Sequence, residues 1–147
     1  MTDENRVQLE AVDVAKRFRR GGRTFPVLER VSLTVRAGEF VTLIGPSGSG
    51  KSTLFRIIGG VERPDSGRIR IGGRDTTGER GHISYMPQQP SLFPWLSVRG
   101  NIAAALAVAG VGKAEAARQA AEWLERIGLG GVANEYPRGL SRGMQQR

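Results

Sequence analysis

Apolar and polar residues alternate over residues 7–12 and again over residues 31–36, and this pattern predicts two half-buried strands. A basic, glycine-containing turn, Arg19 to Arg23, follows the first of them. The continuous apolar run Phe40 to Ile44 predicts a strand of the kind buried in a parallel sheet. The first part of the chain therefore predicts a sheet.

Glycine-rich segments and short apolar runs follow the Phe40 to Ile44 segment. Residues 45–50 form a glycine loop, and residues 52–58 have helical spacing up to a stop at Gly59 and Gly60. Two further short strands are predicted at Arg68 to Ile71 and at Ile83 to Met86. The order strand, glycine loop, helix is typical of α/β proteins.

The second half of the chain has helical periodicity. An alanine-rich helix is predicted from Ser97, its N-cap, through Val108, and a second helix is predicted after Gly112 and up to Gly128. The apolar stripe expected on this second helix consists of Ala117, Ala120, Ala121, Leu124 and Ile127. We therefore expect an α/β fold in which a mixed sheet core is followed by a helical subdomain.

Composition is that of an ordinary globular protein, with 147 residues, 39% hydrophobic and 24% charged. Cysteine is absent, which excludes disulfides and thiolate metal sites and is compatible with a reducing compartment. The polar start of the chain does not resemble a secretory signal. The net charge of +8 fits a solvated basic surface better than a dedicated nucleic-acid patch, because the arginines are scattered.

A glycine loop with a lysine and a serine carries the strongest chemical signal. Residues 45–52 match the Walker A pattern, in which glycines let backbone N–H groups surround phosphate oxygens. Lys51 neutralises the β and γ charges, and the Ser52 hydroxyl is a ligand for Mg²⁺. The predicted ATP-binding residues of this loop are Gly45, Pro46, Ser47, Gly48, Ser49, Gly50, Lys51, Ser52 and Thr53.

Three stretches, Gly45 to Thr53, Pro87 to Trp95 and Leu140 to Arg147, together resemble the ATP-binding subunits of ABC transporters. The Leu-Phe-Pro-Trp segment ending at Trp95 and the Met-Gln-Gln-Arg ending are similar to the nitrate, sulfonate and taurine importers. The resemblance implies the P-loop ATPase fold of this family. It places the P-loop core at about residues 1–88, and the Q-loop, helical subdomain and signature motif at about residues 89–147.

The family resemblance also implies a function and partners. It predicts a transport ATPase that binds ATP and Mg²⁺, forms a head-to-tail dimer with a second ATP-binding subunit, and drives a transmembrane permease. A solute-binding protein would be an indirect partner, and nucleic acid is not expected. The solute would be a small anion or a sulfonate-type compound. The subunit would lie in the cytoplasm, on the inner face of the cell membrane.

Further site residues are carried over from the family at matching positions. Phe18 stands where an aromatic ring stacks on adenine, and Gln88 stands at the Q-loop glutamine that ligates Mg²⁺, with Gln89 as the alternative one position on. Pro94 and Trp95 would then lie near the surface that contacts the permease. The signature motif, which binds the partner's ATP, comprises Leu140, Ser141, Arg142, Gly143 and Met144.

The signature motif competes with a simpler interpretation, and the one histidine of the chain has no site assignment. Leu-Ser-x-Gly is also an ordinary helix N-cap, and Arg142 stands where the family usually has glycine. His82 lies far from the position of the family's switch histidine, so we expect a structural or solvated side chain.

The residues that the family uses for hydrolysis would follow Arg147: a Walker B aspartate, a catalytic glutamate and a switch histidine. We therefore interpret the chain as truncated after the signature motif and expect no catalytic residue within it, negligible ATP turnover, weakened dimer formation and apolar surface left exposed. The alternatives are a nucleotide-binding fragment that does not hydrolyse ATP, or an ABC protein that acts on nucleic acid.

Overall fold

Residues 6–147, described by a computed structural model, divide into two units between Met86 and Pro87. The first unit holds a four-stranded sheet and one helix, α1 (Lys51–Ile58). The described part of the second unit holds helices and no strand. Its helices are α2 (Val98–Val108), α3 (Lys113–Arg126), α4 (Arg142–Gln146) and the short 3₁₀ helices η1 (Gly130–Val132) and η2 (Pro137–Gly139). A sheet-based part followed by a helical part is what the sequence predicts.

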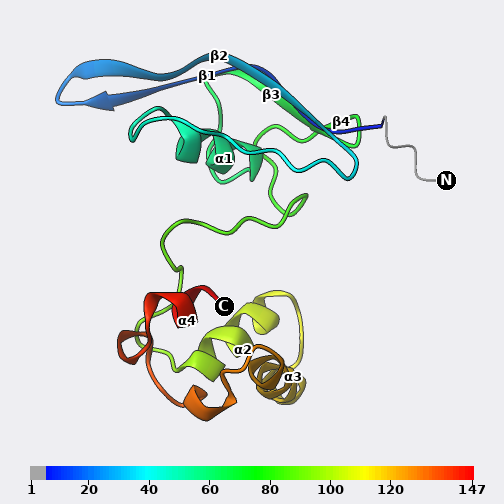
Figure 1. Ribbon diagram of the computed structural model, residues 1–147, viewed down its shortest axis with the longest axis vertical. Helices are drawn as coiled ribbons and strands as arrows, with labels where there is room; N and C mark the ends of the chain where they lie inside the picture. Colours follow the sequence, from blue (N-terminus) through cyan, green and yellow to red (C-terminus); the bar gives the residue numbers. More distant parts are fainter. Residues whose placement is uncertain (1–5) are drawn as a thin grey trace. The chain divides into compact units, whose positions relative to one another are not determined.

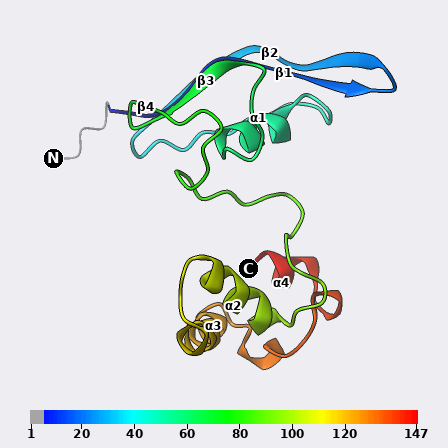
Figure 2. The ribbon, with the colours of Figure 1, turned by 180° about the vertical axis from the view of Figure 1, so that it is seen from behind.

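The sheet of the first unit has the strand order β2-β1-β3-β4, with every neighbouring pair antiparallel. Figures 1 and 2 show α1 lying against one face of this sheet, seen from both sides. The strands are β1 (Val7–Arg20), β2 (Arg23–Arg36), β3 (Ser66–Ile71) and β4 (Arg74–Asp75). The predicted strands at 7–12, 31–36 and 68–71 are therefore confirmed, and the first two are longer than expected.

Strands β1 and β2 form a long hairpin whose turn consists of Gly21 and Gly22. Both glycines have positive φ, 57° and 77°, which is the backbone that a two-residue turn between antiparallel strands requires. Arg20 pairs with Arg23 across this turn. The register shifts several times between Val7 and Arg17, so bulges bend the hairpin.

The core of the first unit lies between α1 and the sheet. Helix α1 contributes Leu54, Ile57 and Ile58, each less than 9% exposed. They pack against four buried residues of the strands, namely Ala11, Val14, Leu28 and Ile69. Burying each large aliphatic side chain contributes about 1.5–3 kcal/mol, so this cluster holds the loop before α1 against β2.

Two predicted strands are wrong. Residues 40–44 and 83–86 have no strand assignment, because no described segment supplies a hydrogen-bonded neighbour for them. Phe40 is 92% exposed, Ile44 93% and Met86 74%, which agrees with the expectation of exposed apolar surface. An apolar run signals burial, but a strand also needs a partner strand.

The core of the second unit forms where α2 and α3 meet the segments that follow them. Its buried residues are Val98, Leu124, Leu129 and Leu140. The predicted N-cap of α2 is confirmed, because the Ser97 hydroxyl accepts a hydrogen bond from the Gly100 amide at 3.1 Å. This cap explains why α2 begins where the sequence predicts, whereas α3 begins after Gly112 with no side-chain cap.

The apolar stripe of α3 differs from the prediction. The buried residues are Ala116, Ala120 and Leu124, whereas Ala117 and Ala121 are exposed. Alanine is small enough to lie on either face of a helix, so its presence does not indicate the buried face. The helix ends near Gly128, as predicted, with φ of 70° at that glycine. No described helix is both long and apolar enough to cross a membrane.

Candidate nucleotide-binding site

The phosphate loop, defined here as Gly45 to Thr53, curls around the side chain of Lys51. The Lys51 ammonium donates hydrogen bonds to the Gly45 carbonyl at 2.7 Å, the Pro46 carbonyl at 2.8 Å and the Ser49 hydroxyl at 3.1 Å. A lysine ammonium has three donors, and these contacts engage it on the loop. The positive charge therefore sits inside the concave backbone that the sequence assigns to phosphate.

Gly50 connects the loop to α1 and can be no other residue without rearrangement. Its φ is 87°, and a Cβ at this position would lie 2.6 Å from the Val27 carbonyl oxygen and 2.8 Å from Leu28 Cδ2. Gly48, with φ of 84°, supplies a second left-handed residue but has open space around it. The two glycines bend the loop back toward the helix, and Gly50 lets the loop pack against β2.

No side-chain hydrogen bond caps the N-terminus of α1 among the described residues. Gly50 provides no side-chain cap, and the first turn has no acidic residue. The first amide groups of a helix have no intrahelical acceptor, and the helix dipole adds partial positive charge there. Ser52 lies exposed in this first turn. The arrangement favours an anion at the start of α1.

Phe18 belongs to β1 and is 37% exposed. The Lys16 ammonium lies 5.5 Å from the centre of its ring. Lys16 itself contacts Glu62 at 2.9 Å and the Arg63 carbonyl at 2.7 Å. The hydrogen bond with Glu62, followed by contributions from Asp65, raises the pKa of Lys16 above its usual value. The ring thus lies beside a cation fixed by acidic neighbours.

Gln88 and Gln89 are both exposed and lie at the start of the second unit. The Gln88 carbonyl accepts a hydrogen bond from the Gln146 side chain of α4 at 3.0 Å. This hydrogen bond connects the Gln88 backbone with the end of α4. Both glutamines belong to the second unit, whereas the phosphate loop belongs to the first. The choice of Gln88 over Gln89 therefore stays a prediction.

The signature segment, Leu140 to Met144, is anchored at its ends and exposed in its middle. Leu140 is 7% exposed in the core of the second unit, and Met144 packs against the same core. Ser141 is the N-cap of α4, its hydroxyl accepting from the Met144 amide at 3.3 Å. Arg142 and Gly143 are exposed, and a Cβ on Gly143 would meet no atom within 4 Å.

Asn101, which belongs to none of the predicted motifs, organises the loop before α2. Its amide donates to the carbonyls of Phe93, Leu96 and Ser97, and its oxygen accepts from the Phe93 amide at 2.7 Å. The side chain is 8% exposed. A polar residue at an inward position of an alanine-rich helix is the signal that could have indicated it.

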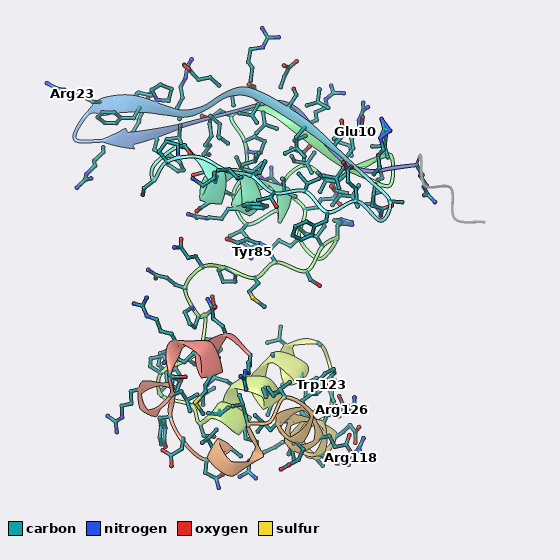
Figure 3. All side chains as sticks on the ribbon, viewed as in Figure 1. Glu10, Arg23, Tyr85, Arg118, Trp123 and Arg126 are labelled. Carbon is teal, nitrogen blue, oxygen red and sulfur yellow. The ribbon has the colours of Figure 1, made fainter. Side chains whose placement is uncertain are left out.

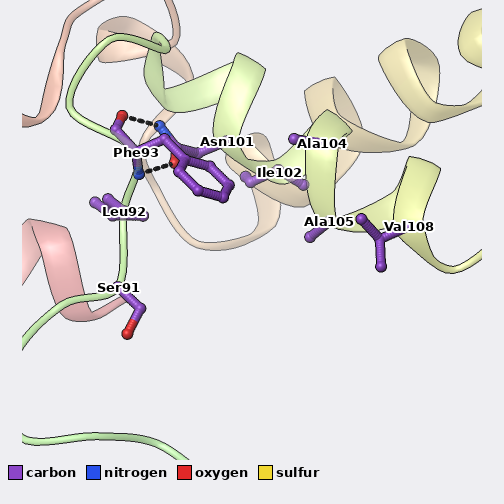
Figure 4. A pocket seen from close by; sticks show the side chains of 8 residues that line it. All are labelled: Ser91, Leu92, Phe93, Asn101, Ile102, Ala104, Ala105 and Val108. Atoms are coloured by element: carbon purple, nitrogen blue, oxygen red, sulfur yellow. Dashed lines mark hydrogen bonds between the residues drawn. The ribbon is translucent and has the colours of Figure 1, made fainter.

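A pocket of about 360 Å³ adjoins this loop (Figure 4). It is lined mainly by apolar side chains of α2, including Ile102 and Val108, and by Phe93. Phe93 also packs against Trp95, with ring centres 5.3 Å apart, and Trp95 is 69% exposed. Apolar lining beside an exposed tryptophan is typical of a surface that contacts another molecule.

Other candidates have structural explanations. His82 Nε2 lies 2.8 Å from Glu79 on the surface, as expected for a structural or solvated histidine. Within residues 6–147 no three acidic, histidine or cysteine side chains converge on a possible metal position.

This chain is similar to known proteins in both sequence and fold. Residues 28–147 match the protein family described as ABC transporter. The spermidine/putrescine import ATP-binding protein of Frankia alni is 43% identical over 142 residues, covering 95% of this chain and 30% of that protein. The sulfate/thiosulfate import ATP-binding protein of Synechococcus elongatus is 41% identical over 150 residues, covering 100% of this chain and 42% of that protein.

A third relative is the methionine import ATP-binding protein of Rhizobium etli, 44% identical over 144 residues, with 92% of this chain and 39% of that protein covered. The chain thus spans 30% to 42% of the length of these relatives.

A solved ATP-binding cassette, a dimer in a post-hydrolysis state bound to ADP and Pi, superposes with a TM-score of 0.78 at 30% identity, covering 93% of this chain and 65% of that chain. A second structure, of a dimeric bacterial ABC transporter cassette, gives the same score at 31% identity and the same coverage. The predicted α/β ATPase-cassette fold is confirmed.

Proposed function

The chain belongs to the ABC transporter family, and from this premise we propose that it acts as the ATP-binding, energy-coupling subunit of an importer. The observation that carries the proposal is the phosphate loop closed around Lys51 and followed by the uncapped start of α1. The relatives with import ATP-binding names support the importer class.

ATP would be held by the phosphate loop and its flanking residues. Lys51 would exchange its hydrogen bonds with loop carbonyls for the β and γ phosphates, because a charged acceptor forms a stronger hydrogen bond than a carbonyl. Backbone amides at the start of α1 would hold the remaining oxygens. Phe18 would stack on adenine. Ser52 and Gln88 would be the protein ligands of Mg²⁺, which neutralises phosphate charge when bound.

The signature segment would contact the ATP of a second subunit in a head-to-tail dimer. Exposed Gly143 leaves room for this contact, because no described atom would lie within 4 Å of a Cβ at this position. Exposed Ser141 would donate to the γ-phosphate, and exposed Arg142 would add a cation nearby. Both structural neighbours are described as dimeric.

The permease would dock on the loop that Asn101 holds. Pro94 and Trp95 lie exposed in this loop, beside the apolar pocket lined by Phe93 and α2. Apolar anchors in pockets account for most of the affinity of many interfaces. The subunit would then lie peripherally at the cytoplasmic face of the membrane, with a solute-binding protein as an indirect partner.

For the solute we propose a small anion or a sulfonate-type compound, on the similarity of the Leu92 to Trp95 segment and the Met144 to Arg147 ending to nitrate, sulfonate and taurine importers. The relatives above import polyamines, methionine or sulfate by name. Uptake measured with nitrate, taurine and spermidine in a strain lacking the gene would discriminate among these classes.

The central test is nucleotide binding by the purified chain and its Lys51→Ala variant. We expect Lys51→Ala to lower the affinity for a fluorescent ATP analogue at least tenfold, because the cation at the β and γ phosphates is lost. Lys113→Ala, which removes an exposed lysine from the second unit, is the matched control and should leave the affinity unchanged. Equal affinity of Lys51→Ala and the unsubstituted chain would overturn the assignment of the phosphate loop.

A further inference from the structure

We propose that the nucleotide base rests on a platform of two phenylalanines, Phe18 and Phe25, with Lys16 as the positioning residue that orients Phe18. The proposal rests on the nucleotide-binding function proposed above, and it adds Phe25 and Lys16 to that site. We call these three residues the base platform.

Phe18 and Phe25 are directly opposite each other in the β1–β2 register. Residues paired in this way project from the same face of the sheet, with Cβ atoms about 4.5–5.5 Å apart. Phe18 is 37% exposed and Phe25 is 48% exposed. Two large apolar side chains therefore lie next to each other and partly open to solvent, which is the surface that a flat ligand needs.

The face on which these rings project is the one that carries α1. Lys16 precedes Phe18 by two residues, so both side chains project from the same face of β1. Lys16 pairs with Leu28, and Leu28 belongs to the core beneath α1. The same Leu28 side chain approaches Gly50, where an added Cβ would be 2.8 Å away. The contact between β2 and the phosphate loop is at Val27 and Leu28. The aromatic pair lies next to this contact along the hairpin, on the side of the turn.

The hairpin continues past α1 toward the turn next to Arg23 (Figures 1 and 3). Phe18 and Phe25 lie in this extension, two pairs before the Arg20–Arg23 pair that closes the hairpin. A nucleotide with its phosphates at the start of α1 would extend its base in this direction, because the phosphate loop is anchored on β2 at Val27 and Leu28.

Lys16 determines how the Phe18 ring is oriented. Its ammonium contacts Glu62 at 2.9 Å, the Arg63 carbonyl at 2.7 Å and Asp65 at 3.4 Å. The same ammonium lies over the Phe18 ring, 5.5 Å from its centre. A cation attracts the electron-rich face of an aromatic ring. Lys16, held in place by the segment after α1, therefore occupies one face of Phe18 and leaves the other for a base.

The chemistry of such a platform is stacking without base-specific hydrogen bonds. Every base has a π-face, so the platform should favour any nucleoside triphosphate over an inorganic triphosphate. Replacing a stacking aromatic residue by alanine typically weakens binding roughly 5- to 150-fold. A positioning cation should contribute less, about 3- to 10-fold.

The experiment measures the affinities of the full chain for Mg-ATP and for inorganic tripolyphosphate, together with the urea midpoint of unfolding. The variants are Phe25→Ala, Phe25→Trp, Lys16→Met and Lys16→Arg. Tyr136→Ala, which removes a 46% exposed aromatic side chain from the second unit, is the matched control. We expect Phe25→Ala and Lys16→Met to weaken ATP binding by the factors above. Tripolyphosphate binding should stay within about twofold, and Phe25→Trp and Lys16→Arg should retain ATP binding.

Each result either supports or contradicts the base platform. If Phe25→Ala binds ATP as tightly as the unsubstituted chain, Phe25 is no base contact. If Lys16→Met weakens ATP and tripolyphosphate equally, or lowers the urea midpoint without altering ATP affinity, Lys16 stabilises the fold only. An unsubstituted chain that binds neither ligand would instead contradict the proposed function, and the base platform with it.

Discussion

At the scale of single residues, the phosphate loop depends on a glycine that is required for two reasons at once. Gly50 has a left-handed φ of 87°, and it lies against the Val27 carbonyl, where a Cβ would approach to 2.6 Å. Gly73, between β3 and β4, has nearly the same φ, 83°, but no described atom would lie within 4 Å of a Cβ added there. Comparing the two positions therefore separates backbone strain from close packing.

We predict that Gly50→Ala lowers the free energy of unfolding by about 1 kcal/mol more than Gly73→Ala does, because only Gly50→Ala adds a clash to the strain of a left-handed residue. Urea unfolding of both variants measures the difference. Gly50→Ala should also weaken ATP binding, whereas Gly73→Ala should not. Equal losses of stability would mean that the approach to Val27 relaxes without cost.

Asp65 is a second residue with a measurable consequence. Its carboxylate accepts a hydrogen bond from the Arg17 amide at 2.7 Å and contacts Lys16, and these interactions, led by the Arg17 amide, lower the pKa of Asp65 below its usual value of 3.8. A lowered pKa in the folded state stabilises the protein above the unfolded-state pKa, and this stabilisation is lost as pH falls through the folded-state value.

We predict that Asp65→Asn reduces the loss of stability that accompanies acidification below about pH 4. The measurement is the free energy of unfolding in urea between pH 7 and pH 2.5, for the unsubstituted chain and for the variant. At pH 7 the variant should be less stable, and the two curves should converge at the lowest pH. Parallel curves over the whole range would show that Asp65 makes no net contribution.

At the scale of the elements, local sequence determines where helices begin, and one buried side chain determines how α2 is joined to the chain before it. Ser97 caps α2 as predicted. Asn101 then ties the preceding loop to the helix through hydrogen bonds to Phe93, Leu96 and Ser97. These contacts support both Trp95 and the apolar pocket, which we propose as the permease surface.

We predict that Asn101→Ala destabilises the chain by about 2–4 kcal/mol, because several backbone groups lose their partner in a buried position. The matched control is Asn134→Ala, which removes an exposed asparagine of the same unit that accepts a hydrogen bond from Arg99. The control should cost less than about 0.5 kcal/mol. Urea unfolding measures both, and a cost below 1 kcal/mol for Asn101→Ala would contradict this role.

The outer face of α3 shows how weakly alanine positions predict burial. Its exposed face carries Trp123, 48% exposed, with the Arg126 guanidinium 5.3 Å from the ring centre, and Arg118 paired with Glu115 (Figure 3). The hydrogen bonds from Arg118 and then from Gln119 lower the pKa of Glu115 to about 2. These polar pairs mark the solvent face more clearly than the alanines mark the core.

At the scale of the whole molecule, the phosphate loop belongs to the first unit and the signature segment to the second. The contact that we propose for the signature segment is with the ATP of a second subunit, so the association of two copies tests it. Gly143 is exposed, and within residues 6–147 neither a positive φ nor a close neighbour requires a glycine there, as is also the case at Gly112 and Gly131. A close approach by another molecule is a physical reason for the absence of a side chain there.

We predict that Gly143→Leu leaves the unfolding free energy within about 0.5 kcal/mol of the unsubstituted chain and leaves ATP affinity unchanged. It should weaken the ATP-dependent association of two copies at least tenfold, because the leucine would occupy the space of the partner's phosphate. Sedimentation over a concentration series with saturating Mg-ATP measures this. Unchanged association would remove Gly143 from the proposed dimer contact.

The sequence by itself determined the features that depend on neighbouring residues: the glycine loop before Lys51, the cap at Ser97, the end of α3 near Gly128 and the hairpin turn at Gly21 and Gly22. Backbone sterics and local hydrogen bonds act within a few residues, so such features can be inferred from the order of amino acids.

Only the tertiary structure decided which residues meet across the chain. Within residues 6–147 it left the apolar segment at 40–44 without a strand partner, and it buried Ala116 instead of Ala117. It also set Phe25 opposite Phe18. Strand pairing and burial depend on contacts between residues far apart in sequence, and a period of apolar residues carries no information about which distant segment will be available to complete them.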